Sequence, residues 1–139
     1  MARDTRTGGV LEAMVLPALE CGGYGYRTQA NIGQRLGCGV HKVDVIAEKD
    51  NRHVLISLKW QQSSGTIEQK VPFETICLAE ALDRGYDKAY VVLGGEGMRA
   101  NLRQFYVSGG LKPFLKVPWD RIDIITLEGF IAKANQGRL

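Results

Sequence analysis

Apolar residues recur every three to four positions over residues 10–19, which predicts an amphipathic helix. Pro17 falls inside this pattern, and we expect it to kink or restart the helix because proline has no amide hydrogen. Gly22 and Gly23 then end the helix. A strand is predicted over residues 24–28, and the polar, glycine-rich stretch after it is expected to form a long loop.

Two segments rich in Val, Ile and Leu follow, KVDVIAE at residues 42–48 and HVLISLKW at residues 53–60. Both are typical of strands. The polar residues 49–52 between them indicate a tight turn, so we expect the two strands to form a hairpin.

The second half of the chain alternates helical and strand patterns. The predicted elements are a helix over 72–84, a strand over 88–93, a helix over 97–107, a strand over 121–126 and a helix from Leu127. Antiparallel strands followed by this alternation indicate an α/β fold with a mixed central sheet flanked by helices. A doubly wound nucleotide-binding fold is less consistent with that order.

The bulk composition is that of an ordinary globular domain. Apolar residues make up 45% of the 139 positions and charged residues 24%, so we expect a single domain over residues 1–139. No apolar run reaches the length of a membrane span, and MARDTRTGG does not resemble a secretory signal. We therefore expect a cytoplasmic protein of bacterial, archaeal or phage origin, without a membrane partner. The net charge of +3 is compatible with an anionic partner but does not require one.

One charged residue interrupts each strand of the predicted hairpin. Asp44 lies within KVDVIAE, while Ser57 and Lys59 lie two residues apart in the neighbouring strand and therefore share a face. A carboxylate beside a lysine suits phosphodiester hydrolysis, in which the carboxylate holds Mg²⁺ and the lysine orients or activates the attacking water.

With these residues in place, the segment 12–84 resembles the PD-(D/E)XK nuclease superfamily of restriction enzymes, junction resolvases and repair nucleases. Asp44 matches the aspartate of the motif, although Val43 stands where proline is common, and Lys59 matches the motif lysine. The resemblance implies a restriction endonuclease-like core.

Ser57 departs from the motif, which expects Asp or Glu at this position. Some restriction enzymes that this chain resembles share the Ser-x-Lys variant and supply the missing carboxylate from the following helix. The resemblance makes Glu74, fifteen residues after Lys59, the natural candidate. Glu68, nine residues after Lys59, is the weaker alternative because it is expected in the connecting loop.

The same resemblance implies roles for further residues. The carbonyl of Leu58 would bind the metal together with Asp44 and Glu74, and Glu12 would be an outer ligand. Gln61 would position the water or touch the phosphate, with Ser57 supporting it. Candidate DNA contacts are the basic residues Arg27, Arg35, Lys42 and Lys70.

Three other features leave alternatives open. His41 could be a ligand or a base, but a single histidine beside a loop is more often neither. Arg99 and Arg103, four residues apart on a predicted helix, could form a second DNA contact. GGEGMR at residues 94–99 lacks the Gly-Lys-Ser/Thr ending of a phosphate loop, so we interpret it as a strand-to-helix turn.

The resulting hypothesis is a Mg²⁺-dependent endonuclease for double-stranded or branched DNA, of restriction, homing or resolvase type. Mn²⁺ is expected to substitute. Because one small chain carries one site and two strands must be cut, a homodimer or a higher homo-oligomer is expected. Ser57 motivates an alternative, a catalytically inactive DNA-binding module of the same fold. A third hypothesis, a small-molecule enzyme of nucleotide-binding type, predicts a deep pocket near residues 94–97.

Overall fold

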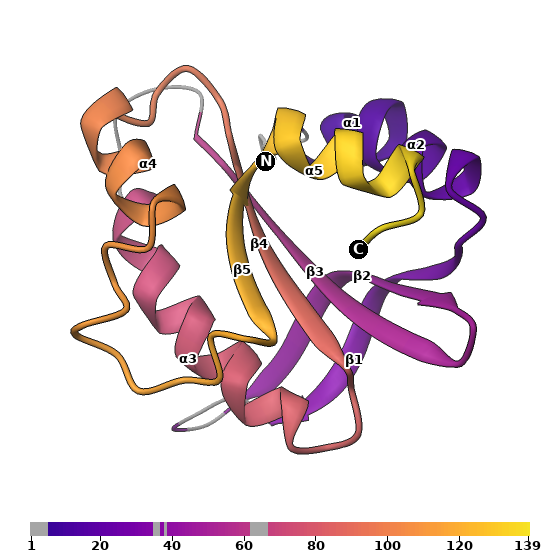
Figure 1. Cartoon of the computed structure of the whole chain (residues 1–139), viewed down its shortest axis with the longest axis horizontal. Helices are drawn as coiled ribbons and strands as arrows, with labels where there is room; N and C mark the ends of the chain where they lie inside the picture. Colours follow the sequence, from indigo (N-terminus) through magenta and orange to yellow (C-terminus); the bar gives the residue numbers. More distant parts are fainter. Residues whose placement is uncertain (1–5, 35–36, 38, 62–66) are drawn as a thin grey trace.

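A five-stranded mixed sheet forms the centre of the molecule (Figure 1). The computed structural model describes residues 6–34, 37, 39–61 and 67–139. The strands are β1 (Gly25–Gln34), β2 (Val40–Lys49), β3 (Arg52–Trp60), β4 (Lys88–Gly94) and β5 (Ile122–Thr126), and they lie in this order across the sheet. Strands β1, β2 and β3 are antiparallel, whereas β3, β4 and β5 are parallel. The predicted mixed α/β fold is confirmed.

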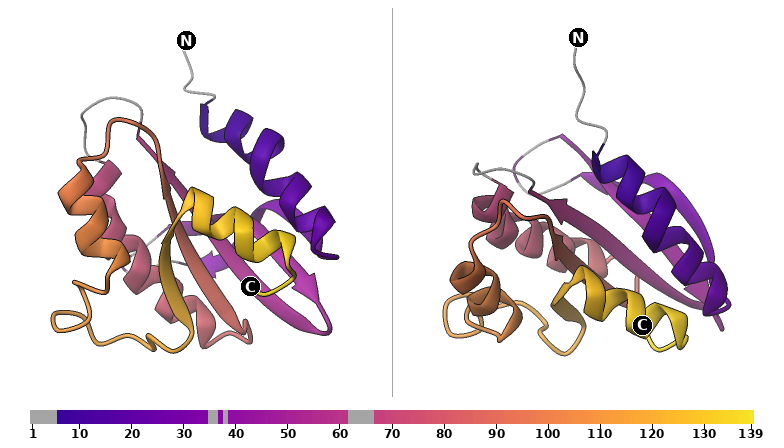
Figure 2. Two further views of the ribbon diagram at one scale, coloured as in Figure 1. Left: turned by 45° about the horizontal axis from the view of Figure 1, so that its top comes forward. Right: turned by 90° about the horizontal axis from the view of Figure 1, so that it is seen from above.

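Helices cover both faces of the sheet (Figure 2). One face carries α1 (Arg6–Val10), the π-helical turn η1 (Leu11–Val15), α2 (Leu16–Cys21) and α5 (Leu127–Asn135). The other carries the 3₁₀ turn η2 (Ile67–Lys70), α3 (Val71–Leu82) and α4 (Ala100–Val107). Two apolar clusters, one against each face, make up the core. No helix in the described ranges is long and apolar enough to cross a bilayer.

The N-terminal helix accommodates its proline by widening. The amide of Leu16 donates to the carbonyl of Leu11, five residues back, and Pro17 then occupies the first turn of α2. Proline is tolerated in a first turn because the amides there have no partner in the helix. The restart predicted at Pro17 is therefore present as a π-helical turn followed by a new helix.

The loop predicted after residue 28 is wrong, because β1 continues to Gln34. Ala30 pairs with Val43 and Asn31 pairs with Lys42 along this part of the strand. An edge strand has one neighbour and is largely exposed, so its polar composition hid the strand signal.

The turn of the predicted hairpin has the expected chemistry. Asp50 and Asn51, between β2 and β3, both have positive φ values, 54° and 65°. Two-residue hairpin turns of this kind favour Asp and Asn, and the predicted hairpin is confirmed.

Helix α4 begins at Ala100 rather than at the predicted residue 97. The preceding residues are held against the end of β3 instead, since the amide of Gly97 donates to the carbonyl of Gln61 at 2.7 Å. Gly95, with a φ of 98°, gives this turn a conformation that other residues rarely adopt.

Candidate active site

Asp44 lies where strands β2 and β3 separate. The two strands are paired from the turn as far as Val45 and Ile56, and the next residues along them are no longer paired. The Leu58 amide instead donates to Asp44 Oδ2 at 2.6 Å. Because the N–H and C=O of a strand residue point to the same side, the Leu58 carbonyl is also directed toward this gap. The gap thus combines a carboxylate with a backbone carbonyl.

The alternation of β2 side chains between the two faces of the sheet reverses at the same place. Val45 and Ala47 pack into the cluster beneath α2 and α5, whereas Val43 packs into the cluster beneath α3. In a regular strand these alternate residues would share one face. The inversion falls at Asp44 and turns its side chain toward β3 rather than into either core.

Strand β1 inverts opposite Asp44. Tyr26 packs with the α2 and α5 cluster and Ala30 with the α3 cluster, and Gln29 between them has a φ of 50°. The Gln29 side chain forms a hydrogen bond with Asp44. A non-glycine residue in this left-handed region is strained, and such strain concentrates at functional sites. The irregularities of both strands therefore meet at Asp44.

Three side chains from the sheet contact Glu74, which lies in the first turn of α3. The Ser57 hydroxyl donates to Glu74 Oε2 at 2.5 Å, and Lys59 Nζ lies 3.6 Å from the same oxygen. His41 Nε2 lies 3.1 Å from Glu74 Oε1. Ser57 and His41 are almost fully buried, with exposures of 1% and 3%, so they hold the carboxylate firmly. The Glu74 carboxylate therefore lies in direct contact with the side chain at position 57.

The two carboxylates have opposite pKa shifts. Burial raises the pKa of Asp44 above 3.8, assisted by the negative charge of Glu74 and opposed by the Leu58 amide, Lys59 and Gln29. Burial also acts to raise the pKa of Glu74, but His41, Lys59 and Ser57 together outweigh it and lower that pKa below 4.5. Glu74 is thus stabilised as an anion, whereas the interactions of ionised Asp44 do not fully offset the cost of its burial.

The donor atoms present suit a hard divalent cation. Asp44, Glu74 and the Leu58 carbonyl offer oxygen ligands, which Mg²⁺ prefers. A carboxylate has about four acceptor sites, and hydrogen bonds with Ser57 and His41 use two of those on Glu74, so about two remain for a metal. Within residues 6–34, 37, 39–61 and 67–139, no three acidic, histidine or cysteine side chains gather as a ready metal site. Water and substrate oxygens would have to complete the coordination.

Two residues expected in the site lie elsewhere. Gln61 is buried, and its side-chain amide donates to the Gly97 carbonyl at 2.9 Å, so it holds the turn before α4. Glu12 is exposed on η1, which packs against the sheet face opposite α3, and it has no hydrogen bond or ion pair to any described residue. The structure brings neither side chain to the Asp44–Glu74 group.

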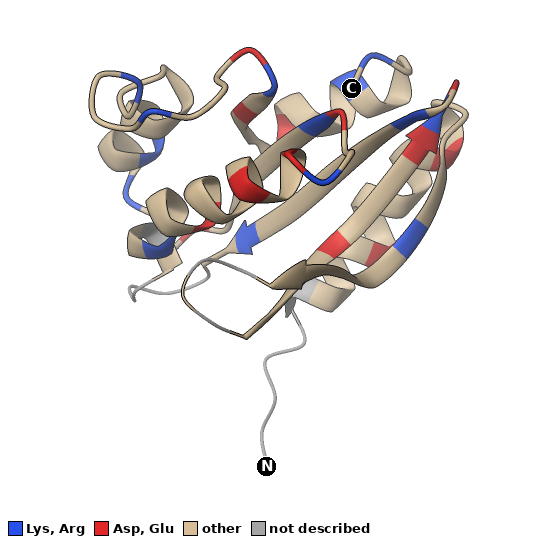
Figure 3. Ribbon diagram, turned by 90° about the horizontal axis from the view of Figure 1, so that it is seen from below, with Lys and Arg blue, Asp and Glu red and all other residues tan. Residues whose placement is uncertain are grey.

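Other predicted residues surround the site or cannot be placed. Arg27 on β1, Lys42 on β2 and Lys70 on η2 are exposed, and basic and acidic positions are interspersed over this side of the molecule (Figure 3). Arg35 lies outside the described residues. Glu68 belongs to η2, but its side chain is not among those described.

Of the residues that contact the carboxylates, the sequence left the role of His41 open and gave no indication of Gln29. His41 precedes Asp44 by three residues, and the strand inversion between them turns both toward the site. Gln29 was placed in a loop, and the β1 register that sets it opposite Asp44 could not be read from its polar surroundings. A strand prediction extended to residue 34 would have brought Gln29 into consideration.

Comparison with known proteins identifies the family of the chain. No curated protein sequence matches the chain significantly. A solved structure, "Crystal Structure of Protein of Unknown Function AF1548", aligns with a TM-score of 0.48 and 14% identity. The alignment covers 81% of this chain and 54% of that one, so this chain spans about half of its length. A family model described as a PD-(D/E)XK nuclease superfamily domain matches residues 3–138. The chain therefore belongs to the PD-(D/E)XK nuclease superfamily.

Proposed function

We propose that residues 1–139 form a single nuclease domain that hydrolyses DNA with Mg²⁺, using Asp44, Glu74 and Lys59. The supporting observation is the position of Glu74, whose Oε2 accepts from Ser57 and lies 3.6 Å from Lys59 Nζ. A serine in the motif removes one carboxylate, and α3 supplies another at the same point. Membership of a nuclease superfamily supports the chemistry.

Each residue of the site has a separate task. Asp44, Glu74 and the Leu58 carbonyl hold the cation, while Ser57 fixes the Glu74 carboxylate. A bound Mg²⁺ supplies a Lewis acid for the phosphoryl oxygen and lowers the pKa of its water. Lys59 orients or activates the attacking water and offsets the negative charge that develops on the phosphate. Mn²⁺ is expected to replace Mg²⁺ because both accept oxygen ligands.

The proposed substrate is double-stranded or branched DNA, as for a restriction, homing or resolving enzyme in the cytoplasm. Arg27, Lys42 and Lys70, with Arg35 beyond the described part, would neutralise backbone phosphates without reading sequence. Cutting both strands with one site per chain favours a homodimer. Gln61 acts by holding the turn before α4, and the proposal needs no contribution from Glu12.

The test is a cleavage assay on plasmid and branched DNA with Mg²⁺ or Mn²⁺. Asp44→Ala, Lys59→Ala and Glu74→Gln are each expected to reduce cleavage by about 10²-fold or more. Glu80→Gln is a matched control on the exposed side of α3, where Glu80 contacts Arg84, and it should cleave normally. Undiminished cleavage by Asp44→Ala and Lys59→Ala would exclude the proposed site. Tight DNA binding without cleavage under any condition would favour the inactive binding module instead.

A further inference from the structure

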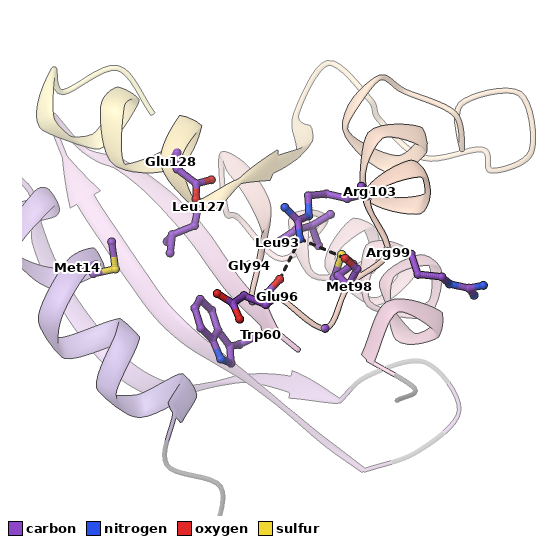
Figure 4. A pocket seen from close by; sticks show the side chains of 13 residues that line it. Met14, Trp60, Leu93, Gly94, Glu96, Met98, Arg99, Arg103, Leu127 and Glu128 are labelled. Carbon is purple, nitrogen blue, oxygen red and sulfur yellow. Dashed lines mark hydrogen bonds between the residues drawn. The ribbon is translucent and has the colours of Figure 1, made fainter. Parts of the chain in front are cut away.

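A cavity of about 690 Å³ opens beyond the ends of β3 and β4, where Trp60 and Gly94 line it (Figure 4). Trp60 follows Lys59 directly, so the two side chains leave opposite faces of β3. In Figure 4, Met14 and Leu127 lie to one side of Trp60, and Arg103 of α4 lies to the other. The cavity is of the size in which proteins bind nucleotide-sized molecules.

The floor of the cavity is held rigidly. The backbone amide of Gln61 donates to the Gly94 carbonyl at 3.0 Å, and the Gly97 amide donates to the backbone carbonyl of Gln61 at 2.7 Å. A Cβ at Gly94 would lie 2.8 Å from the Trp60 ring, so the indole lies directly against the backbone there. A Cβ at Gly95 would lie 2.1 Å from the Gln61 carbonyl oxygen. The cavity is therefore formed before any ligand binds, which lowers the entropic cost of binding.

The walls combine an aromatic ring with a guanidinium whose hydrogen bonds go to backbone carbonyls. Trp60 is half-buried, and its indole nitrogen has no hydrogen-bond partner among the described residues. Arg103 Nη2 donates to the carbonyls of Gly95 and Met98 at 2.9 and 3.3 Å, which orients the guanidinium without neutralising it. No carboxylate of the described chain pairs with Arg103, whose Nε is also without a partner. A flat ring could stack on the Trp60 indole, and an anionic group on the same ligand could pair with the Arg103 guanidinium.

The acidic residues determine which kind of anion fits. Glu96 and Glu128 also line the cavity and are exposed, so they disfavour a small free anion such as phosphate. A carboxylate can instead accept hydrogen bonds from the amino groups on the edge of a nucleobase. The aromatic ring and the acceptor match the base of a nucleotide, and the cation matches its phosphate.

We propose that this cavity binds one nucleotide, with its base against Trp60 and Glu96 and its phosphate at Arg103. The nucleotide is either a free mononucleotide or an unpaired unit of a nucleic acid strand. The second source rests on the proposed nuclease function, because the strand would also have to reach the Asp44–Glu74 site. The first source does not depend on that function.

The direct test uses the fluorescence of Trp60. Trp119 is the second tryptophan, so Trp119→Phe leaves Trp60 as the only indole. The four deoxynucleoside monophosphates and a single-stranded oligonucleotide are titrated separately, in EDTA to prevent cleavage, with inorganic phosphate as a control. Saturable quenching by either nucleotide form is expected, because a stacked base quenches an indole. Quenching by the oligonucleotide alone identifies a strand as the source, whereas quenching by a mononucleotide identifies a free nucleotide.

Matched substitutions then separate stacking from general effects. By calorimetry, Trp60→Leu should weaken nucleotide binding by roughly tenfold, the size expected for loss of base stacking, and Trp119→Leu should not. Folding of each variant is checked by its thermal transition. In Asp44→Ala, nucleotide should still quench the fluorescence of Trp60 even where the substitution abolishes cleavage. Failure of the nuclease proposal would therefore not affect this result. Absence of saturable quenching with every nucleotide, or equal binding by Trp60→Leu and wild type, would overturn the inference.

Discussion

Replacing Ser57 with alanine removes one hydroxyl from the centre of the proposed site. Ser57 is 1% exposed, and its hydroxyl donates to Glu74 Oε2 at 2.5 Å. After the substitution, Oε2 retains only Lys59, at 3.6 Å. Hydrogen bonds to charged groups contribute about 1.5–3 kcal/mol, so we expect Ser57→Ala to lower the free energy of unfolding by about 2 kcal/mol at about pH 7.

This loss of stability should depend on pH. The pKa of Glu74 is lowered in the folded protein, so its ionised interactions stabilise the fold above pH 4.5, the ordinary pKa, and are lost as pH falls through the folded value. Once Glu74 is protonated, Ser57 contacts a neutral group, and such bonds contribute about 1 kcal/mol. The difference between wild type and Ser57→Ala should therefore fall from about 2 to about 1 kcal/mol under acid conditions.

Urea denaturation followed by circular dichroism, at about pH 7 and at the lowest pH at which the protein stays folded, measures both values. Thr75→Val is the matched control, since Thr75 is the next residue on α3, is fully buried, and donates to the neutral carbonyl of Val71 at 2.8 Å. Its effect should be the same at both pH values. Equal stability of Ser57→Ala and wild type at neutral pH, or a pH-independent difference, would refute the reasoning about Glu74.

Two further substitutions test other parts of the structure. Asp44→Asn should raise the free energy of unfolding by about 1 kcal/mol at about pH 7 without metal. The pKa of Asp44 is raised in the folded protein, so its ionisation costs stability as pH rises above 3.8. Urea denaturation at both pH values measures this, and a destabilised variant at neutral pH would contradict it. Gly95→Ala should lower the free energy of unfolding by at least about 3 kcal/mol, because its φ is 98° and the new Cβ would meet the Gln61 carbonyl. Gly25→Ala, whose new Cβ meets open space, should change stability little. Thermal unfolding compares the two variants, and similar transition temperatures would contradict the structure of this turn.

Most of the central fold could be predicted because its signals are local. The apolar runs of β2 and β3 and the polar turn between them identify the hairpin without reference to the rest of the chain. The end of β1 could not be found in this way, because an edge strand that is exposed along most of its length has no apolar alternation. The start of α4 depends on hydrogen bonds to Gln61, a residue more than thirty positions earlier.

The same distinction applies to the site. Asp44 and Lys59 could be proposed from strand patterns, and Glu74 from its distance along the chain and the resemblance. The contacts of Glu74 with His41 and Ser57 depend on how α3 packs against the sheet, which no local pattern records. Gln29 depends on an inverted strand opposite Asp44. The cavity near residues 94–97 was expected only under the nucleotide-binding hypothesis, and the structure places it beside the proposed nuclease site.

The central claim, that Glu74 replaces the carboxylate missing at Ser57, is tested most directly by measuring Mn²⁺ affinity. Isothermal calorimetry on wild type, Glu74→Gln and Glu68→Gln compares the two possible ligands with the same chemical change. The account predicts that Glu74→Gln weakens Mn²⁺ binding by at least about tenfold, and that Glu68→Gln binds as wild type does. Unchanged affinity in Glu74→Gln, or a comparable loss in Glu68→Gln, would contradict it.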